Sequence, residues 1–168
     1  PSIPQIQKLF DDGKIGKSEQ QLMTGIITNS IQMITHHSGQ SESGKNIIIL
    51  SADTESILIS DAAAAAFRSQ NWNVFSIGDM SSSIDVLFDL ELRKLLSKTW
   101  KSKKGLMIIL IFSQSEEGLK FFSDSFYSVK EKSENNLFIV LSGKTGKKVK
   151  IKADLSTPAL EDILQWSN

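Results

Sequence analysis

The sequence predicts an α/β domain in which a parallel sheet carries helices on both faces, preceded by a short helical segment. Three observations support this fold class. The chain has 168 residues of which 40% are hydrophobic, enough for one domain to bury a core without disulfides or metals. From residue 46 onward, short apolar runs alternate with segments of helical periodicity, as in sheets of parallel strands. Before residue 46 only helical periodicity occurs.

The first part of the chain predicts two helices and a linker. Residues 3–10 carry apolar side chains at one-face spacing, and residues 19–36 form a longer amphipathic stretch. Residues 38–45 are rich in Ser and Gly, which is typical of a linker. We therefore expect three parts: a helical cap over 1–37, a linker over 38–45, and an α/β domain over 46–168.

The second part predicts alternating strands and helices. We expect strands at 46–50, 72–77, 106–112 and 137–141, an exposed fifth strand at 149–153, and helices at 57–69, 83–96, 118–129 and from Thr157-Pro158 to 166. Glycine is expected to close the second strand at Gly78, and the Ser142-Gly143 pair to close the fourth. The strand order expected of such a chain is that of the flavodoxin-like doubly wound fold.

Ligands of doubly wound sheets lie beyond the carboxyl ends of the strands, where the strand order reverses. This rule selects the loops that follow Leu50, Ile77, Phe112 and Leu141. The candidate binding residues in these loops are Asp53, Ser56, Gly78, Ser113, Ser142 and Gly143.

Composition excludes several classes of function. The chain has no Cys, so thiol catalysis, disulfides and thiolate metal sites are ruled out. Lys plus Arg and Asp plus Glu are both 19, which gives no basic nucleic-acid surface, and the basic run at 143–152 is interpreted as a solvated turn. No stretch is long and apolar enough to span a membrane. We expect a cytoplasmic protein.

The chemistry-bearing residues predict no enzyme and no metal site. The two histidines, His36 and His37, are adjacent at a predicted helix end, so they do not share a helix face and would not hold one metal together. Compensation of the helix dipole is the commoner role there, although one of them could be an axial ligand of a tetrapyrrole. No Ser–His–acid arrangement is supported, because neither His falls near a strand end.

Several segments together resemble a known family. Residues 6–22 are similar to a helix–turn–helix segment with a Trp…Glu-His signature, with Phe10 at the Trp and Gln20-Gln21 at the Glu-His pair. Counting back from Asn71-Trp72-Asn73-Val74 places Ser56 at the His of an Asp/Glu-x-His-x-x-Gly loop. Ser113 resembles the Ser of a Ser-x-Leu motif, and Gly143 the second residue of a Gly-Gly pair. The chain thus resembles the cobalamin-binding sensor domain of MerR-type, light-responsive transcription regulators.

In that family the loop His binds cobalt from below, the bundle His can bind it from above, and the Trp shields the upper face. This sequence lacks all three, so histidine-ligated cobalamin binding of the usual kind is not expected. The resemblance implies a groove with Phe10, Gln20 and Gln21 above it and Ser56, Ser113 and Gly143 below. Such a groove could bind cobalamin without protein ligation, a haem or another flat molecule, or it could be filled by side chains and serve only for assembly.

The resemblance implies a sensor and oligomerisation domain of a transcription regulator, a homo-oligomer that reaches DNA only through an N-terminal domain missing from this chain. Two alternatives stay open. A pseudo-receiver interaction module would cluster acids after Leu50 and bind a divalent cation, although no Asp ends the third strand. A phosphohexomutase-like domain would need a reactive Ser113, although the loop around it differs from the expected one.

Overall fold

A computed structural model describes residues 3–16, 44–81, 96, 100, 105–130, 136–143 and 151–167. The chain divides into two compact units, Pro1–Gly39 and Gln40–Asn168. The first unit contains α1, Ile3–Asp11, which confirms the predicted first helix. Gly13 then takes a left-handed conformation with φ 67°, and the Lys14 amide donates to the Leu9 carbonyl, so the helix ends there. The predicted helix at 19–36 lies outside the described residues, as do Gln20, Gln21, His36 and His37.

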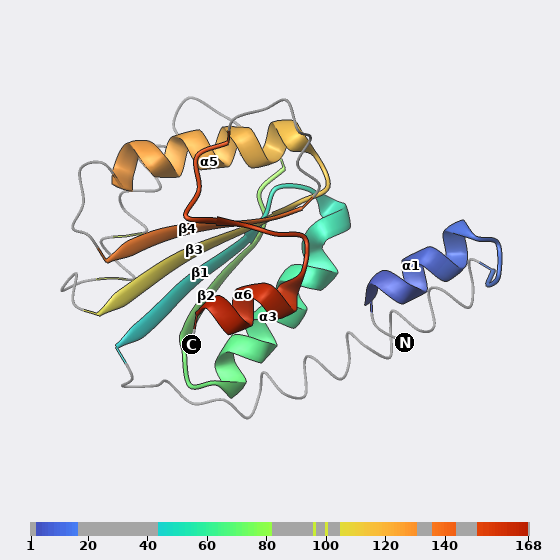
Figure 1. The fold of residues 1–168 in the computed structure, drawn as a ribbon, viewed down its shortest axis with the longest axis horizontal. Coiled ribbons are helices and arrows are strands. Elements are labelled where there is room, and N and C mark those ends of the chain that lie inside the picture. The colour runs from blue at the N-terminus through green and yellow to red at the C-terminus, as the bar shows by residue number, and fades with distance from the viewer. Residues whose placement is uncertain are drawn as a thin grey trace. The chain divides into compact units, whose positions relative to one another are not determined.

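The second unit is built on a parallel sheet with the order β2-β1-β3-β4-β5 (Figure 1). Every pair of neighbouring strands is parallel. This is the order of the flavodoxin-like doubly wound fold, and the predicted fold class is confirmed. The strands are β1 Lys45–Ser51, β2 Asn73–Asp79, β3 Leu106–Ser113, β4 Leu137–Gly143 and β5 Leu155–Ser156.

Helices cover both faces of this sheet (Figure 1). The helix α5, Glu116–Lys130, packs Phe122 and Phe126 on one face, while α3, Ile57–Ser69, and α6, Leu160–Trp166, cover the other. The central strands β1 and β3 are therefore buried on both sides, and Ile47 to Leu50 have 0% exposed surface. A continuous apolar run is what such a doubly covered strand requires.

Two of the predicted strand ends differ from the structure. Gly78 lies inside β2, and Ser142-Gly143 lie inside β4. In β2 the pairing with β1 skips Ile77, so a bulge sits there and Gly78 takes φ 82°. Glycine in a strand marks such a bulge as readily as a strand end. In β4 the continuation past Leu141 pairs Ser142 and Gly143 with the last two residues of β3.

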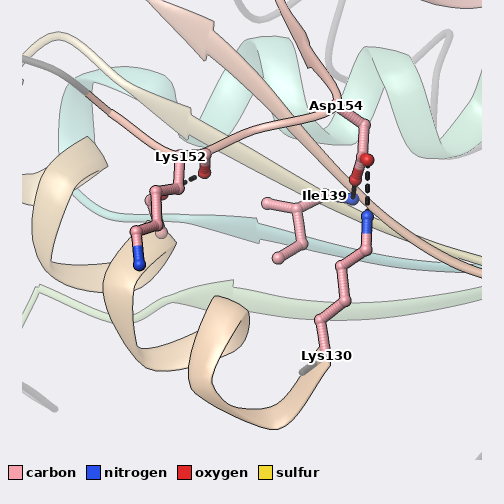
Figure 2. A network of polar contacts seen from close by, with 5 residues as sticks. Lys130, Ile139, Lys152 and Asp154 are labelled. Carbon is pink, nitrogen blue, oxygen red and sulfur yellow. Dashed lines mark hydrogen bonds and ion pairs between the residues drawn. The ribbon is translucent and has the colours of Figure 1, made fainter. Parts of the chain in front are cut away.

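The fifth strand was predicted at 149–153, which is wrong for the described part of that range. Residues 151–153 form no strand, and β5 is Leu155–Ser156. Asp154, which follows residues 151–153, bonds to Ile139 of β4 (Figure 2). Its amide donates to the Ile139 carbonyl over 2.8 Å, and its side-chain Oδ2 accepts from the Ile139 amide over 2.7 Å.

Asp154 also joins this segment to α5 (Figure 2). The Lys130 ammonium lies 2.5 Å from Asp154 Oδ1, and the Ser123 hydroxyl donates to the Lys152 carbonyl.

The last helix was predicted to open at Thr157-Pro158, but α6 begins at Leu160. The Thr157 hydroxyl oxygen accepts from the Ala159 amide over 3.2 Å, a local bond that holds the chain in a turn before the helix.

None of the helices within the described part of the chain is long and apolar enough to cross a membrane.

Candidate functional site at the carboxyl ends of β1 and β3

A polar network joins the carboxyl ends of the two central strands. Asp53 follows β1, and its Oδ2 accepts from the Ser113 hydroxyl over 2.6 Å and from the Gln114 amide over 2.7 Å. Its Oδ1 accepts from the Ser56 amide over 2.9 Å. Asp53 is thereby the N-cap of the short helix η1, Thr54–Ser56, that leads into α3. One carboxylate thus fixes the turn after β1 and the turn after β3.

Ser113 is fully buried in this network, with 0% of its surface exposed. Besides its bond to Asp53, its hydroxyl oxygen accepts from the Ser115 amide over 3.0 Å. Two glycines make room for it. A Cβ at Gly118 would lie 2.9 Å from Ser113 Oγ, and one at Gly143 would lie 1.9 Å from the Ser113 carbonyl oxygen. Both positions therefore require glycine for this packing.

The hydrogen bonds lower the pKa of the Asp53 carboxyl. Partial burial is the largest single influence and raises that pKa, but the bonds from Ser113, Ser56 and Gln114 together outweigh it. The Ser56 hydroxyl is fully buried and has no hydrogen-bond partner of ordinary geometry. The Ser56 side chain is nevertheless among the groups that lower the pKa of the Asp53 carboxyl.

The structure brings Asp53, Ser56, Ser113 and Gly143 together, as the rule of strand ends predicts. Ser142 is buried one residue earlier in β4, opposite Phe112. Gly78 lies in the neighbouring strand β2. Its carbonyl accepts from the Ser51 hydroxyl at the end of β1 over 3.1 Å. Phe10 is half-buried within the separate N-terminal unit, so its expected place above the strand ends stays a prediction.

Sequence reasoning missed the Gln114 amide, although it makes one of the shortest bonds to Asp53. It also left out Ser115, whose amide and carbonyl both lie near the Ser113 hydroxyl. These are backbone groups, which every residue except proline carries. The residue type at positions 114 and 115 therefore gives no signal of this role.

The described residues at this edge of the sheet bear on the two alternative functions. Within the described residues no group of three or more His, Cys, Asp or Glu side chains is placed to hold a metal ion, and the Asp53 carboxylate already accepts three bonds. The phosphohexomutase-like alternative needs an accessible serine, whereas Ser113 is fully enclosed. Neither alternative gains support from this edge of the sheet.

Comparison with known proteins finds similar folds among solved structures. No family model matches the sequence, and no curated protein matches it. Among solved structures, the Methanosarcina barkeri monomethylamine corrinoid protein is similar over 96% of this chain and 74% of its own, with a TM-score of 0.65 and 11% identity. A cobalamin-binding protein from Desulfitobacterium hafniense is similar over 97% of this chain and 76% of its own, with a TM-score of 0.50 and 15% identity. The shared property is the fold.

Proposed function

We propose that this chain is a non-enzymatic sensor and oligomerisation domain of a transcription regulator that has the cobalamin-binding fold without histidine ligation of cobalt from the loop after β1. The observation that carries this proposal is the Asp53–Ser56–Ser113 network. It occupies the strand ends at which a ligand of a doubly wound sheet binds, and it consists of hydroxyl, amide and carboxylate groups. Both histidines of the chain precede β1 in the sequence.

A domain of this kind would hold cobalamin through contacts to the corrin and its substituents, without a cobalt ligand from the protein. Haem is the second flat molecule that we propose as a ligand of this domain. Binding would change the association of identical chains, and DNA affinity would follow through linkage to a DNA-binding domain elsewhere in the regulator. We also propose that the protein is cytoplasmic.

The first test is an absorption spectrum of the purified chain in the dark, before and after addition of hydroxocobalamin, adenosylcobalamin or haemin. We expect a stoichiometric change with at least one of the three. Light scattering with and without that ligand should then show a different molar mass. Three spectra equal to those of the free ligands, or an unchanged mass on binding, would refute the sensing role.

The mode of ligation needs a second measurement. Cob(II)alamin is bound to unlabelled protein and to protein labelled with ¹⁵N, and the electron spin resonance spectra are compared. A nitrogen of the cofactor's own base gives the same splitting in both samples, which is the expected result. A splitting that changes with the label would show that a protein nitrogen binds the cobalt, and would overturn cobalamin binding without protein ligation.

A further inference from the structure

The two edges of the sheet differ in how they are protected against pairing with another chain. At one edge β5 has only two residues, and Asp154 binds the Ile139 amide beside it. The Lys130 ammonium pairs with that carboxylate, and Lys152 is exposed in the same segment. Short edge strands and charged side chains are common means of preventing a further strand from adding to a sheet. This edge is therefore closed.

The other edge, formed by β2, lacks these protections over most of its length. It has seven residues, and among the described strands it pairs only with β1. The sequence from Ser69 to Gly78 contains no charged residue and no proline. A Cβ placed at Gly78 would meet no described atom within 4 Å, so the edge is open at that point.

The apolar side chains of β2 are only partly covered by the chain itself. Phe75 and Ile77 pack against the core on the α5 side of the sheet and Val74 on the α3 side, and all three keep part of their surface exposed. Ser76, in the middle of the strand, is exposed. The neighbouring β1, by contrast, buries all its apolar side chains completely. Apolar surface along an open strand edge favours the addition of another strand.

We propose that β2 is an interface between two copies of this chain, which pair antiparallel about a twofold axis at Ser76. The inference deepens the proposed oligomerisation role and rests on it. In this register Phe75 of each copy lies opposite Ile77 of the other, and Val74 lies opposite Gly78, which has no side chain to obstruct it. The bulge at Ile77 adds local twist, and two-stranded contacts accept more twist than wide sheets do.

Charge and symmetry support this arrangement. Asp79 is the only charged residue of β2, and the twofold register places the two Asp79 side chains at opposite ends of the contact, about 20 Å apart. This separation exceeds the screening length of roughly 8 Å at physiological salt. The formal net charge of zero adds no overall repulsion between copies. Because the β5 edge is closed, pairing ends at two copies and does not continue into a fibre.

The absence of cysteine from the chain permits a direct test. In Ser76→Cys the two thiols would face each other, because Cα atoms of directly opposed residues lie about 4.5–5.5 Å apart, within the range that a disulfide spans. Ser156→Cys is the matched control, since Ser156 is also an exposed serine in an edge strand. With oxidised glutathione as the oxidant and dilute protein, we expect Ser76→Cys to form a covalent dimer about tenfold faster or more.

A second measurement uses charge and does not depend on oxidation. Ser76→Lys places two ammonium groups opposite each other, and Ser76→Asp places two carboxylates there, so each variant alone should sediment as a monomer. A mixture of the two should regain the dimer, because opposite charges then face each other. Ser156→Lys, at the other edge, should leave the dimer unchanged. Circular dichroism checks that each variant is folded.

Equal cross-linking of the two cysteine variants, or a mixture of Ser76→Lys and Ser76→Asp that stays monomeric, would overturn the assignment of β2. An unchanged chain that sediments as a monomer at every concentration would overturn it as well. A dimer that Ser76→Lys leaves intact also overturns it, while the proposed oligomerisation role stands on another surface. A β2 dimer whose mass does not respond to cobalamin or haemin refutes the sensing role and leaves the β2 interface standing.

Discussion

Asp154 provides a sharp test of how the last segment of the chain is attached to the sheet. In Figure 2 its carboxylate bonds both to the Ile139 amide in β4 and to the Lys130 ammonium of α5. Asp154→Ala removes both bonds and leaves the Ile139 amide without its acceptor. Asp154→Asn keeps an acceptor oxygen for the amide and removes only the charge. The pair of variants therefore separates the backbone pairing from the ion pair.

The two contributions differ in size. A buried amide left without an acceptor costs about 1–3 kcal/mol, and the lower half of this range applies because Asp154 lies at the surface. The ion pair is worth about 0.2–1 kcal/mol, since the Lys130 and Asp154 side chains retain 21% and 23% exposure. We expect Asp154→Ala to lose about 2 kcal/mol, or roughly 4–8 °C in Tm for a chain of this size. Asp154→Asn should lose about 0.5 kcal/mol.

Urea unfolding followed by circular dichroism measures both free energies, and hydrogen exchange reports the Ile139 amide directly. Its protection should fall in Asp154→Ala and persist in Asp154→Asn. Lys130→Met, which removes the ion pair from the other side, should cost as little as Asp154→Asn. Equal losses in the two Asp154 variants, or a loss below about 0.5 kcal/mol in Asp154→Ala, would refute the assignment of Asp154 as a substitute for strand pairing.

Three further predictions concern the carboxyl edge and α3. Gly143→Ala should cost more than about 3 kcal/mol in urea unfolding, because its Cβ would lie 1.9 Å from the Ser113 carbonyl oxygen; a cost below about 1 kcal/mol would contradict this packing. The lowered pKa of Asp53 stabilises the fold above the ordinary carboxyl pKa, and this stabilisation is lost as the pH falls through the folded value. Asp53→Asn should therefore show a shallower acid-side loss of stability, whereas curves of equal slope would argue against the network. Burial raises the pKa of Asp61 despite the opposing charge of Arg68, so Asp61→Asn should raise the urea midpoint at pH 7 but not in acid; an equal gain at both would count against the burial effect.

Periodicity predicts the centre of the sheet well and its margins poorly. The apolar runs of β1 and β3 and the Ala-rich α3 match the structure closely, because these elements bury a face against several others and their patterns are correspondingly strong. The last strand depends on Asp154, which lies next to Ile139 only in the folded chain. Neither hydrophobic periodicity nor turn chemistry carries a signal of that contact.

The candidate site likewise has a part that the sequence predicts and a part that it does not. Strand ends can be located from the sequence, so Asp53, Ser56 and Ser113 are selected correctly as neighbours. What they do there follows from a bond between side chains 60 residues apart and from a backbone amide. The sequence therefore predicts the location of the network, while its geometry and its charge balance require the folded structure.

The central position of β1 has a consequence for synthesis of the protein. The Asn46 side chain bonds the carbonyl of Leu106, 60 residues further along, so β1 leaves the ribosome well before its partner β3. At about 5–20 residues per second, the interval is roughly 3–12 s. During that time the uncharged run Asn46-Ile47-Ile48-Ile49-Leu50 has the composition of segments that stack between chains. The nascent chain should depend on chaperones during this interval, and a slow translation step before β3 should lower the yield of folded protein.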